Sequence, residues 1–352
     1  MLPSTMVDPH LRMTRTPGVT LKDVAKAAGV SPMAVSVALN GSTSRARVSD
    51  ETRKRIQAIA EHLGYRANSI ARSLHRQRSD IIGLWSGRKV FNANSPFTAA
   101  ILHGIQLGCA EHGKDFLLHG AVMIQGRDSD EVAYRELADG KIDGVIIDAE
   151  PDDPRIERLR RTGLALVSIV EVLAGVPSVL CDDAAAGRLM CAHIHERGHR
   201  RVLWRSLIHP VMSQIARRGA FLDEAQRRGM AVEMSTFGYD SPGLTADEHA
   251  LLDPARSGRC TALVGFADNG VPRVLDDLDR LGWSVPGQIA VAGFDGLSQF
   301  MEATPRHALT TVVMPWGEVA RQAVGILARL IDGQPAPQCT VLPVDLRIGT
   351  TT

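Results

Sequence analysis

Residues 19–40 read VTLKDVAKAAGVSPMAVSVALN, and this stretch predicts two short helices joined by a tight turn. Thr20 and Asp23 have the spacing of a capping box, and apolar residues then recur at helical intervals. Gly29 can adopt the left-handed conformation that ends a helix. Ser31 can cap the second helix, and the proline after it suits the first turn because no amide donor is needed there.

A third helix is expected behind this pair. It is capped by Ser49, carries two acids in its first turn, and turns Ile56, Ile59, Ala60 and Leu63 inward. The second helix is expected to bury Val35, Ala38 and Leu39 and to present Pro32, Met33, Ser36, Val37 and Asn40 on its other faces. Together these segments form a helix-turn-helix with a supporting helix.

The charge of the chain is unevenly distributed. Val19–Arg78 carries eleven Lys or Arg residues against four acids, a net charge of +7. The 274 residues that follow sum to −7, because residues 1–18 contribute +1 and the whole chain carries +1. This segregation indicates a polyanion-binding head on an acidic body, although charge alone leaves a solvated basic face open.

The composition is that of a globular protein, with 352 residues, 44% of them hydrophobic and 22% charged. No apolar run approaches the roughly 18 to 20 residues of a membrane-spanning helix, and the first dozen residues lack the apolar core of a signal peptide. The five cysteines form no C-x-x-C pair, so neither disulfides nor a zinc site is expected. We therefore expect a cytoplasmic protein with no membrane contact, metal or cofactor.

Several motifs of the head resemble the N-terminal module of the LacI/GalR family of bacterial transcription regulators. They are VTLKDVAKAAGVS at 19–31, AVSVALN at 34–40, VSDETR at 48–53 and LGYRAN at 63–68. The segment NSIARSL at 68–74 is similar to the hinge helix of that family, with Leu74 at the position of the leucine that wedges into the minor groove. The alternative is a plain linker in which Leu74 packs on a neighbour.

The resemblance implies a set of DNA contacts in which the second helix enters the major groove. Many relatives carry Arg where this chain has Val37, so a two-bond grip on guanine is absent there. Arg53 is expected to contact phosphate together with the three arginines of the following set. The expected DNA-binding residues are Thr20, Ser31, Pro32, Met33, Ser36, Val37, Asn40, Arg45, Arg47, Asn68, Ala71, Arg72 and Leu74.

From Asp80 onward, strand-like runs alternate with amphipathic segments, which predicts parallel sheets covered on both faces. Strands are expected at 81–85, 116–119, 144–148, 166–169, 201–204, 261–266 and 289–293. Helices are expected at 99–112, 131–138, 184–197, 215–228, 247–253, 274–281 and 317–331. The length and the absence of a nucleotide-binding fingerprint favour two α/β subdomains with a cleft between them.

The body resembles the effector domain of the same family, which is similar to the periplasmic sugar-binding proteins. Its landmarks are SPF at 95–97, IDGVI at 142–146, CDD at 181–183, RGHRR at 197–201 and VAGFD at 291–295. The resemblance implies an effector site made of Phe97, Thr98, Arg217, Ala267, Asp268 and Asp295. Ala267 replaces a common Asn and Val170 a common acid, so the ligand can be a sugar, a sugar acid or another small metabolite.

We therefore expect a disordered extension (1–18), a helix-turn-helix domain (19–67), a hinge (68–79) and an effector-binding and dimerisation domain (80–352). The expected function is that of a homodimeric transcription regulator, a repressor of operator DNA controlled by a small-molecule effector. One head makes too few contacts for specific affinity, which favours a dimer. A transport-type solute-binding module and an α/β enzyme acting on a sugar or nucleoside are the alternatives.

Overall fold

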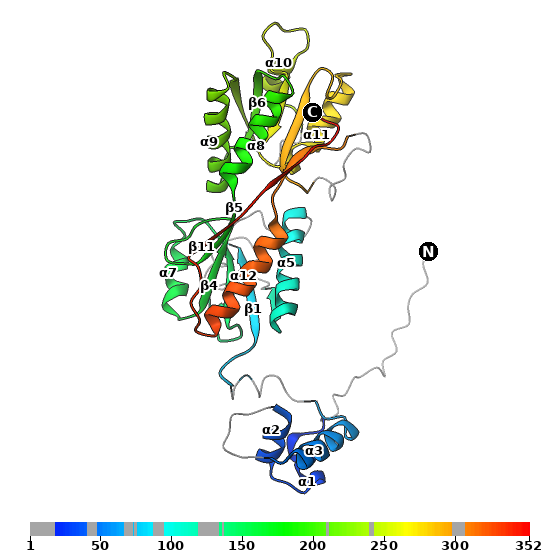
Figure 1. The fold of residues 1–352 in the computed structure, drawn as a ribbon, viewed down its shortest axis with the longest axis vertical. Coiled ribbons are helices and arrows are strands. Elements are labelled where there is room, and N and C mark those ends of the chain that lie inside the picture. The colour runs from blue at the N-terminus through cyan, green and yellow to red at the C-terminus, as the bar shows by residue number, and fades with distance from the viewer. Residues whose placement is uncertain are drawn as a thin grey trace, which may run out of the picture. The chain divides into compact units, whose positions relative to one another are not determined.

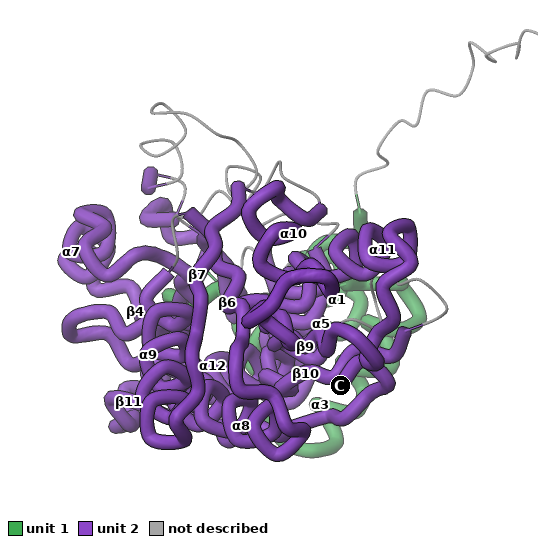
Figure 2. The backbone as a smooth tube through the Cα atoms, turned by 90° about the horizontal axis from the view of Figure 1, so that it is seen from above, with its two compact units in different colours: residues 1–79 green, residues 80–352 purple. Residues whose placement is uncertain are grey.

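The computed structural model describes residues 18–40, 48–66, 73, 76–86, 95–118, 134–135, 137–208, 211–238, 243–297 and 307–352. The chain divides into two compact units, residues 1–79 and residues 80–352, which Figure 2 distinguishes by colour. Residues 1–17 of the expected extension, residues 68–72, 74 and 75 of the hinge, and half of the helix expected at 131–138 lie outside the described residues.

The smaller unit contains the three expected helices, α1 (Leu21–Ala28), α2 (Pro32–Asn40) and α3 (Asp50–His62). Their packed faces form one small core. Its buried members are Val24, Ala25, Ala28, Val35, Ala38, Ile56 and Ala60. The residues expected to face inward from α3 all contribute, because Ile59 and Leu63 pack at the edge of this core. The predicted helix-turn-helix with a supporting helix is thereby confirmed.

The larger unit contains two six-stranded sheets. The strands of the first are β1 (Ile81–Ser86), β2 (Asp115–Leu118), β3 (Gly144–Asp148), β4 (Ala165–Ile169), β5 (Ser178–Cys181) and β11 (Cys339–Leu342). They lie in the order β11-β5-β4-β3-β1-β2, and every pair is parallel. Every residue of β3 is buried. Since successive side chains of a strand point to opposite faces, this burial means that both faces of the sheet are covered.

The second sheet is built from later segments of the chain. Its strands are β6 (Arg201–Leu207), β7 (Ala231–Phe237), β8 (Ala262–Gly265), β9 (Ala290–Asp295), β10 (Thr310–Val313) and β12 (Asp345–Arg347). They lie in the order β12-β10-β9-β8-β6-β7, with β12 antiparallel to β10 and the other pairs parallel. The expected α/β body of two parallel-sheet subdomains is confirmed, with one antiparallel edge strand.

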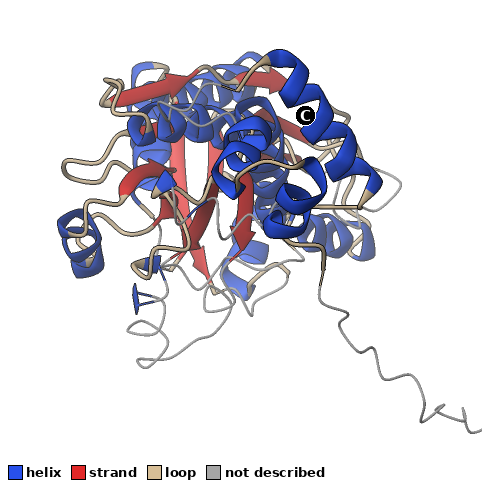
Figure 3. Ribbon diagram, turned by 90° about the horizontal axis from the view of Figure 1, so that it is seen from below, coloured by secondary structure: helices blue, strands red, loops and turns tan. Residues whose placement is uncertain are grey.

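Helices cover these strands, as Figure 3 shows in blue around red. The helices of the first lobe are α5 (Pro96–His112), α7 (Pro154–Arg161) and α12 (Trp316–Ile331). Those of the second lobe are α8 (Asp183–Glu196), α9 (Met212–Arg227), α10 (Ala246–Leu252) and α11 (Pro272–Arg280). In the described residues the chain passes between the lobes at β5–α8, at β10–α12 and at β11–β12 (Figure 1).

Six elements of the body were not predicted from the sequence. They are β5, β7, β10, β11, β12 and α7. Strands β7 and β11 lie at or near sheet edges and leave many side chains exposed, so they lack a hydrophobic run. Helix α7 is mostly charged and buries only Ile156 and Leu159. Asp153 caps this helix by accepting from the Arg155 N–H at 2.9 Å.

Glycines let the two helices of the first lobe, α5 and α12, come unusually close. A Cβ on Gly104 would lie 2.0 Å from the backbone oxygen of Gly317, and one on Gly108 would lie 2.7 Å from Cβ of Val324. Real Cβ atoms do not approach that closely. The glycines of α5 therefore set the distance at which α12, the helix after the second crossing, packs on the first lobe.

We predict that Gly104→Ala lowers the free energy of unfolding by about 1–3 kcal/mol, because the methyl group collides with backbone atoms that cannot rotate away. Gly219→Ala on α9 is the matched control, since nothing lies within 4 Å of its added Cβ. The control should gain up to about 1 kcal/mol from its better helix propensity. Urea unfolding of both variants measures the difference, and equal effects would contradict the close packing.

Candidate functional site

The helices of the head begin at capped residues, as expected. The Asp23 carboxylate accepts from the Thr20 N–H at 2.8 Å and from the Thr20 hydroxyl at 2.7 Å. The Ser31 Oγ accepts from the Ala34 N–H at 3.2 Å, and the Ser49 Oγ accepts from the Thr52 N–H at 3.3 Å. These bonds satisfy donors that the first helical turns would otherwise leave unpaired. They fix the angle at which α2 leaves the turn.

The start of α2 forms the exposed surface of the head that the sequence predicted. The Met33 side chain is 59% exposed, Pro32 and Ser31 are exposed, and Ser36 is half-buried. Val37 differs from the expectation, because it is only 4% exposed. The sequence periodicity placed Val37 opposite the α2 core face but did not account for burial from outside that core. Its assignment as a base-facing residue stays a prediction that rests on the motif.

Arg53 has a structural role that the sequence did not suggest. Its Nη1 donates to the backbone oxygen of Ala38 at 3.0 Å and to that of Val37 at 3.5 Å. A cation at the carboxyl end of a helix also interacts favourably with the helix dipole. Arg53 therefore links α3 to the carboxyl end of α2 by hydrogen bonds.

Seven of the expected DNA-binding positions cannot be compared with the structure. Arg45, Arg47, Asn68, Ala71, Arg72 and Leu74 lie outside the described residues, as does the side chain of Asn40. Their roles stay predictions that rest on the motif alone.

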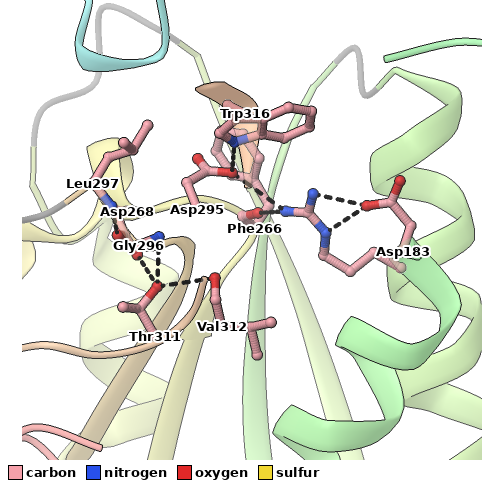
Figure 4. Close-up of polar contacts among 10 residues, drawn as sticks. Asp183, Phe266, Asp268, Asp295, Gly296, Leu297, Thr311, Val312 and Trp316 are labelled. Atoms are coloured by element: carbon pink, nitrogen blue, oxygen red, sulfur yellow. Dashed lines mark hydrogen bonds and ion pairs between the residues drawn. The ribbon is translucent and has the colours of Figure 1, made fainter. Parts of the chain in front are cut away.

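In the body, Arg217 of α9 lies at the centre of a buried polar cluster. Its side chain is 3% exposed. Its Nε and Nη2 donate to Oδ1 of Asp183 at 3.0 and 2.8 Å, and its Nη1 donates to the backbone oxygen of Phe266 at 2.8 Å (Figure 4). The guanidinium carbon also lies 4.8 Å from the ring centre of Phe294. Three elements, α8, the end of β8 and β9, thus surround one cation.

Asp295 ends β9 and completes the cluster. Its Oδ1 lies 4.0 Å from Nη1 of Arg217 and accepts from the indole Nε1 of Trp316 at 3.2 Å (Figure 4). Its backbone φ of 106° is a conformation that residues other than glycine rarely adopt. Burial raises the pKa of Asp295 to about 6; Arg217 and Trp316 oppose this rise and Asp183 adds to it. Burial also raises the pKa of Asp183, against the effect of Arg217.

Phe97, in the first turn of α5, contacts Trp316 of this cluster, and Thr98 is the next residue of that turn. The ring of Phe97 packs edge-on against Trp316, with ring centres 5.1 Å apart. Thr98 is fully buried, and its Oγ1 has no hydrogen-bond partner among the described residues. An unpaired buried hydroxyl is costly and is the kind of group that a ligand or water can satisfy.

Asp268 points away from the Arg217 cluster. Its Oδ1 accepts from the Thr311 hydroxyl at 2.7 Å and its Oδ2 accepts from the Leu297 N–H at 2.8 Å (Figure 4). Asp268 thus ties the segment after β8 to β10 and to the turn after β9. Its neighbour Ala267 is buried, 6% exposed. Neither residue contributes a polar group to the Arg217 cluster.

Sequence reasoning missed three residues of this region. Asp183 was noted only as part of a motif, and Trp316 was not considered. Glu171 follows Val170, whose φ is 72°, and its Oε1 accepts from the backbone N–H of Ser213 in the first turn of α9 at 3.3 Å. The sequence signals that could have indicated these residues were acids that follow a strand, for Asp183 and Glu171, and an aromatic residue at the start of a helix, for Trp316. Only the chain crossings between the lobes bring them together.

Two histidines near the end of α8 lie within hydrogen-bond distance of threonine hydroxyls. The Nε2 of His193 lies 2.8 Å from the hydroxyl of Thr352, and Nδ1 of His199 lies 2.8 Å from that of Thr261. Among the described residues no group of three His, Cys, Asp or Glu side chains could hold a metal ion. Within the same part of the chain, no helix is long and apolar enough to cross a bilayer.

Two family models match the chain. The model of bacterial regulatory proteins of the lacI family matches residues 20–68, and that of the periplasmic binding protein-like domain matches residues 191–352. The first match covers the three-helix head, and the second covers α9, β8 and β9, whereas Asp183 precedes it.

The chain is also similar to characterised regulators along its length. It is 27% identical to the HTH-type transcriptional regulator GalR of Escherichia coli K12 over 325 residues, 91% of this chain and 92% of that protein. It is 29% identical to the ribose operon repressor of Bacillus subtilis 168 over 335 residues, 92% and 96% of the two chains. A solved structure of the transcriptional regulator CelR in complex with cellobiose matches with a TM-score of 0.66 and 26% identity, covering 95% of this chain and all of that chain.

We predict that Asp295→Asn removes a pH dependence from the stability of the protein. Because the folded-state pKa of Asp295 lies above the ordinary value of 3.8, the folded state binds its proton more tightly than the unfolded state does. The free energy of unfolding of the native protein therefore falls as the pH rises from about 4 to about 6, by on the order of 1–3 kcal/mol from this group. Asn cannot ionise and tolerates a positive φ.

Urea unfolding between pH 4 and 7 measures this difference between the variant and the native protein. Asp152→Asn, which removes an exposed carboxylate, is the matched control and should track the native protein. A difference between Asp295→Asn and the native protein that stays constant with pH would contradict the assignment.

Proposed function

We propose that this protein is a repressor of the LacI family of bacterial regulatory proteins and that a small-molecule effector controls its affinity for operator DNA. The head binds DNA and the body binds the effector. The protein acts in the cytoplasm, where the chromosome lies, and catalyses no reaction.

The head is proposed to place the start of α2 in the major groove. Met33 is exposed there and can contact thymine methyl groups, while Ser36 can hydrogen-bond to base edges. The proposed DNA-binding set is Thr20, Ser31, Pro32, Met33, Ser36, Val37, Asn40, Arg45, Arg47, Asn68, Ala71, Arg72 and Leu74. Two heads in a homodimer would contact two half-sites, with the hinge of residues 68–79 between each head and the body.

The effector is proposed to lie against Asp295 and Arg217, with Phe97 and Thr98 on the side of the first lobe. Ligands of open α/β sheets bind outside the carboxyl ends of the strands, and β8 and β9 end at this cluster. The buried Thr98 hydroxyl without a described partner is the observation that favours a ligand here. Asp268 and Ala267 are left out, because Asp268 is committed to the backbone and to Thr311.

One observation carries the proposal. The same chain contains a capped helix-turn-helix and, after it, a two-lobed body with a charged cluster at its strand ends. A transport-type binding module would leave the head without a role. An enzyme would need a reactive group in the cluster, and Arg217, Asp183 and Asp295 are held in hydrogen bonds or ion pairs with one another.

We predict that the full-length protein retains a small set of genomic DNA fragments and that a metabolite extract changes their affinity by roughly five- to 150-fold, the usual range of an allosteric coupling. Arg217→Ala should bind the fragments and lose the response to the extract. Arg218→Ala, its neighbour on α9, is the matched control and should respond like the native protein. Retention is measured by fragment selection and sequencing.

Two results would count against the proposed function. The first is failure of the native protein to retain any fragment, with or without extract. The second is turnover of an extract component by the protein, which would favour the enzyme alternative.

A further inference from the structure

The Nε/Nη2 fork of Arg217 is already occupied by the protein. Its Nε and Nη2 form a fork that matches a carboxylate or phosphate, and Oδ1 of Asp183 fills that fork at 3.0 and 2.8 Å. Its Nη1 donates to the backbone oxygen of Phe266. A ligand anion could reach the fork of Arg217 only by displacing Asp183.

Helix packing builds this contact into the fold. Gly187 lies one turn after Asp183 on α8, on the face towards α9. A Cβ on Gly187 would lie 2.2 Å from the backbone oxygen of Arg217 and 2.9 Å from the backbone nitrogen of Phe221. Only a glycine allows this approach, and it brings the start of α8 and the Arg217 turn of α9 together. Asp183 therefore does not depend on a flexible loop to find Arg217.

The remaining side of the cluster carries a hydrogen-bond acceptor, the carboxylate of Asp295. Asp295 lies 4.0 Å from Arg217 through Oδ1, which also accepts from the indole of Trp316. Its Oδ2 has no hydrogen bond among the described residues, and the side chain is 14% exposed. Two carboxylates, Asp183 and Asp295, face one cation. A ligand anion placed here would meet two like charges in a buried site, where repulsion is screened poorly.

We propose that Asp183 determines the specificity of the effector site by occupying the fork of Arg217. The group of the effector that lies against this cluster is then a hydrogen-bond donor, a hydroxyl or an amine directed at Asp295, and a carboxylate or phosphate is refused there. The inference rests on the proposed function, in that the cluster is the effector site. It narrows the ligand classes that the sequence left open, because a sugar acid cannot place its carboxylate in the Nε/Nη2 fork of Arg217.

The test uses full-length protein at pH 7.5 without DNA or effector, with inorganic phosphate and sulfate as probes and sodium chloride at matched ionic strength as reference. Thermal unfolding at increasing anion concentration gives an apparent anion affinity. In Asp183→Ala the fork is free, and we expect an anion affinity at least ten-fold higher than in the native protein. Asp183→Asn keeps an oxygen near the fork without its charge and should fall between the two.

Two further variants separate anion binding from general effects. The double variant Asp183→Ala/Arg217→Ala should lose the gained affinity, because the fork is gone. Asp182→Asn removes the neighbouring carboxylate, which accepts from the Ala185 N–H and does not bind Arg217, and should stay within two-fold of the native protein. Salting effects of sulfate on the whole surface act on all variants alike.

Two outcomes would overturn the proposal. One is a native protein whose phosphate or sulfate affinity equals that of Asp183→Ala and disappears in Arg217→Ala, since Arg217 would then bind anions despite Asp183. The other is a folded Asp183→Ala that gains no anion affinity. Neither outcome depends on operator binding, so the proposed function can fail or hold separately.

Discussion

The candidate effector site depends on a buried cation, Arg217, and on the acceptors that surround it. A charge taken out of water is tolerated only when it is paired and hydrogen-bonded, and Arg217 receives Asp183, the Phe266 carbonyl and the nearby Asp295. These partners come from the start of α8 and the ends of β8 and β9. Pairing therefore holds the ends of two strands and the start of α8 against the middle of α9.

The same cluster reaches the first lobe through Trp316. This residue begins α12 directly after a crossing between the lobes, and it joins Asp295 by a hydrogen bond and Phe97 by a ring contact. Helix α12 then packs closely on α5 at Gly104. A ligand that changes the hydrogen bonds of Asp295 would thus act on the helix pair of the first lobe, whose first strand, β1, follows the hinge in sequence. Regulation by this route requires only a modest coupling free energy, about 1 to 3 kcal/mol.

Local features were predictable from the sequence. The caps at Thr20, Ser31 and Ser49 depend on residues three positions apart, and the buried strand at 144–148 is a continuous apolar run. Features set by distant contacts were not. Helical periodicity places Val37 on the face of α2 opposite the core, yet its side chain is buried. Asp268 accepts from a backbone N–H instead of facing the cluster. Asp183 contacts Arg217 only because α8 and α9 pack closely at Gly187. The edge strands β11 and β12 are paired only through chain crossings.

A double-mutant cycle on Arg217 and Asp183 tests most directly whether this buried pair organises the site. Urea unfolding of the full-length native protein, Arg217→Met, Asp183→Asn and the double variant gives the four free energies. Arg217→Met alone should cost about 3–5 kcal/mol, because it leaves buried carboxylates without their cation. The loss of unfolding free energy in the double variant should be smaller than the sum of the two single losses by about 1–3 kcal/mol. Losses that add to within about 0.5 kcal/mol would contradict the account.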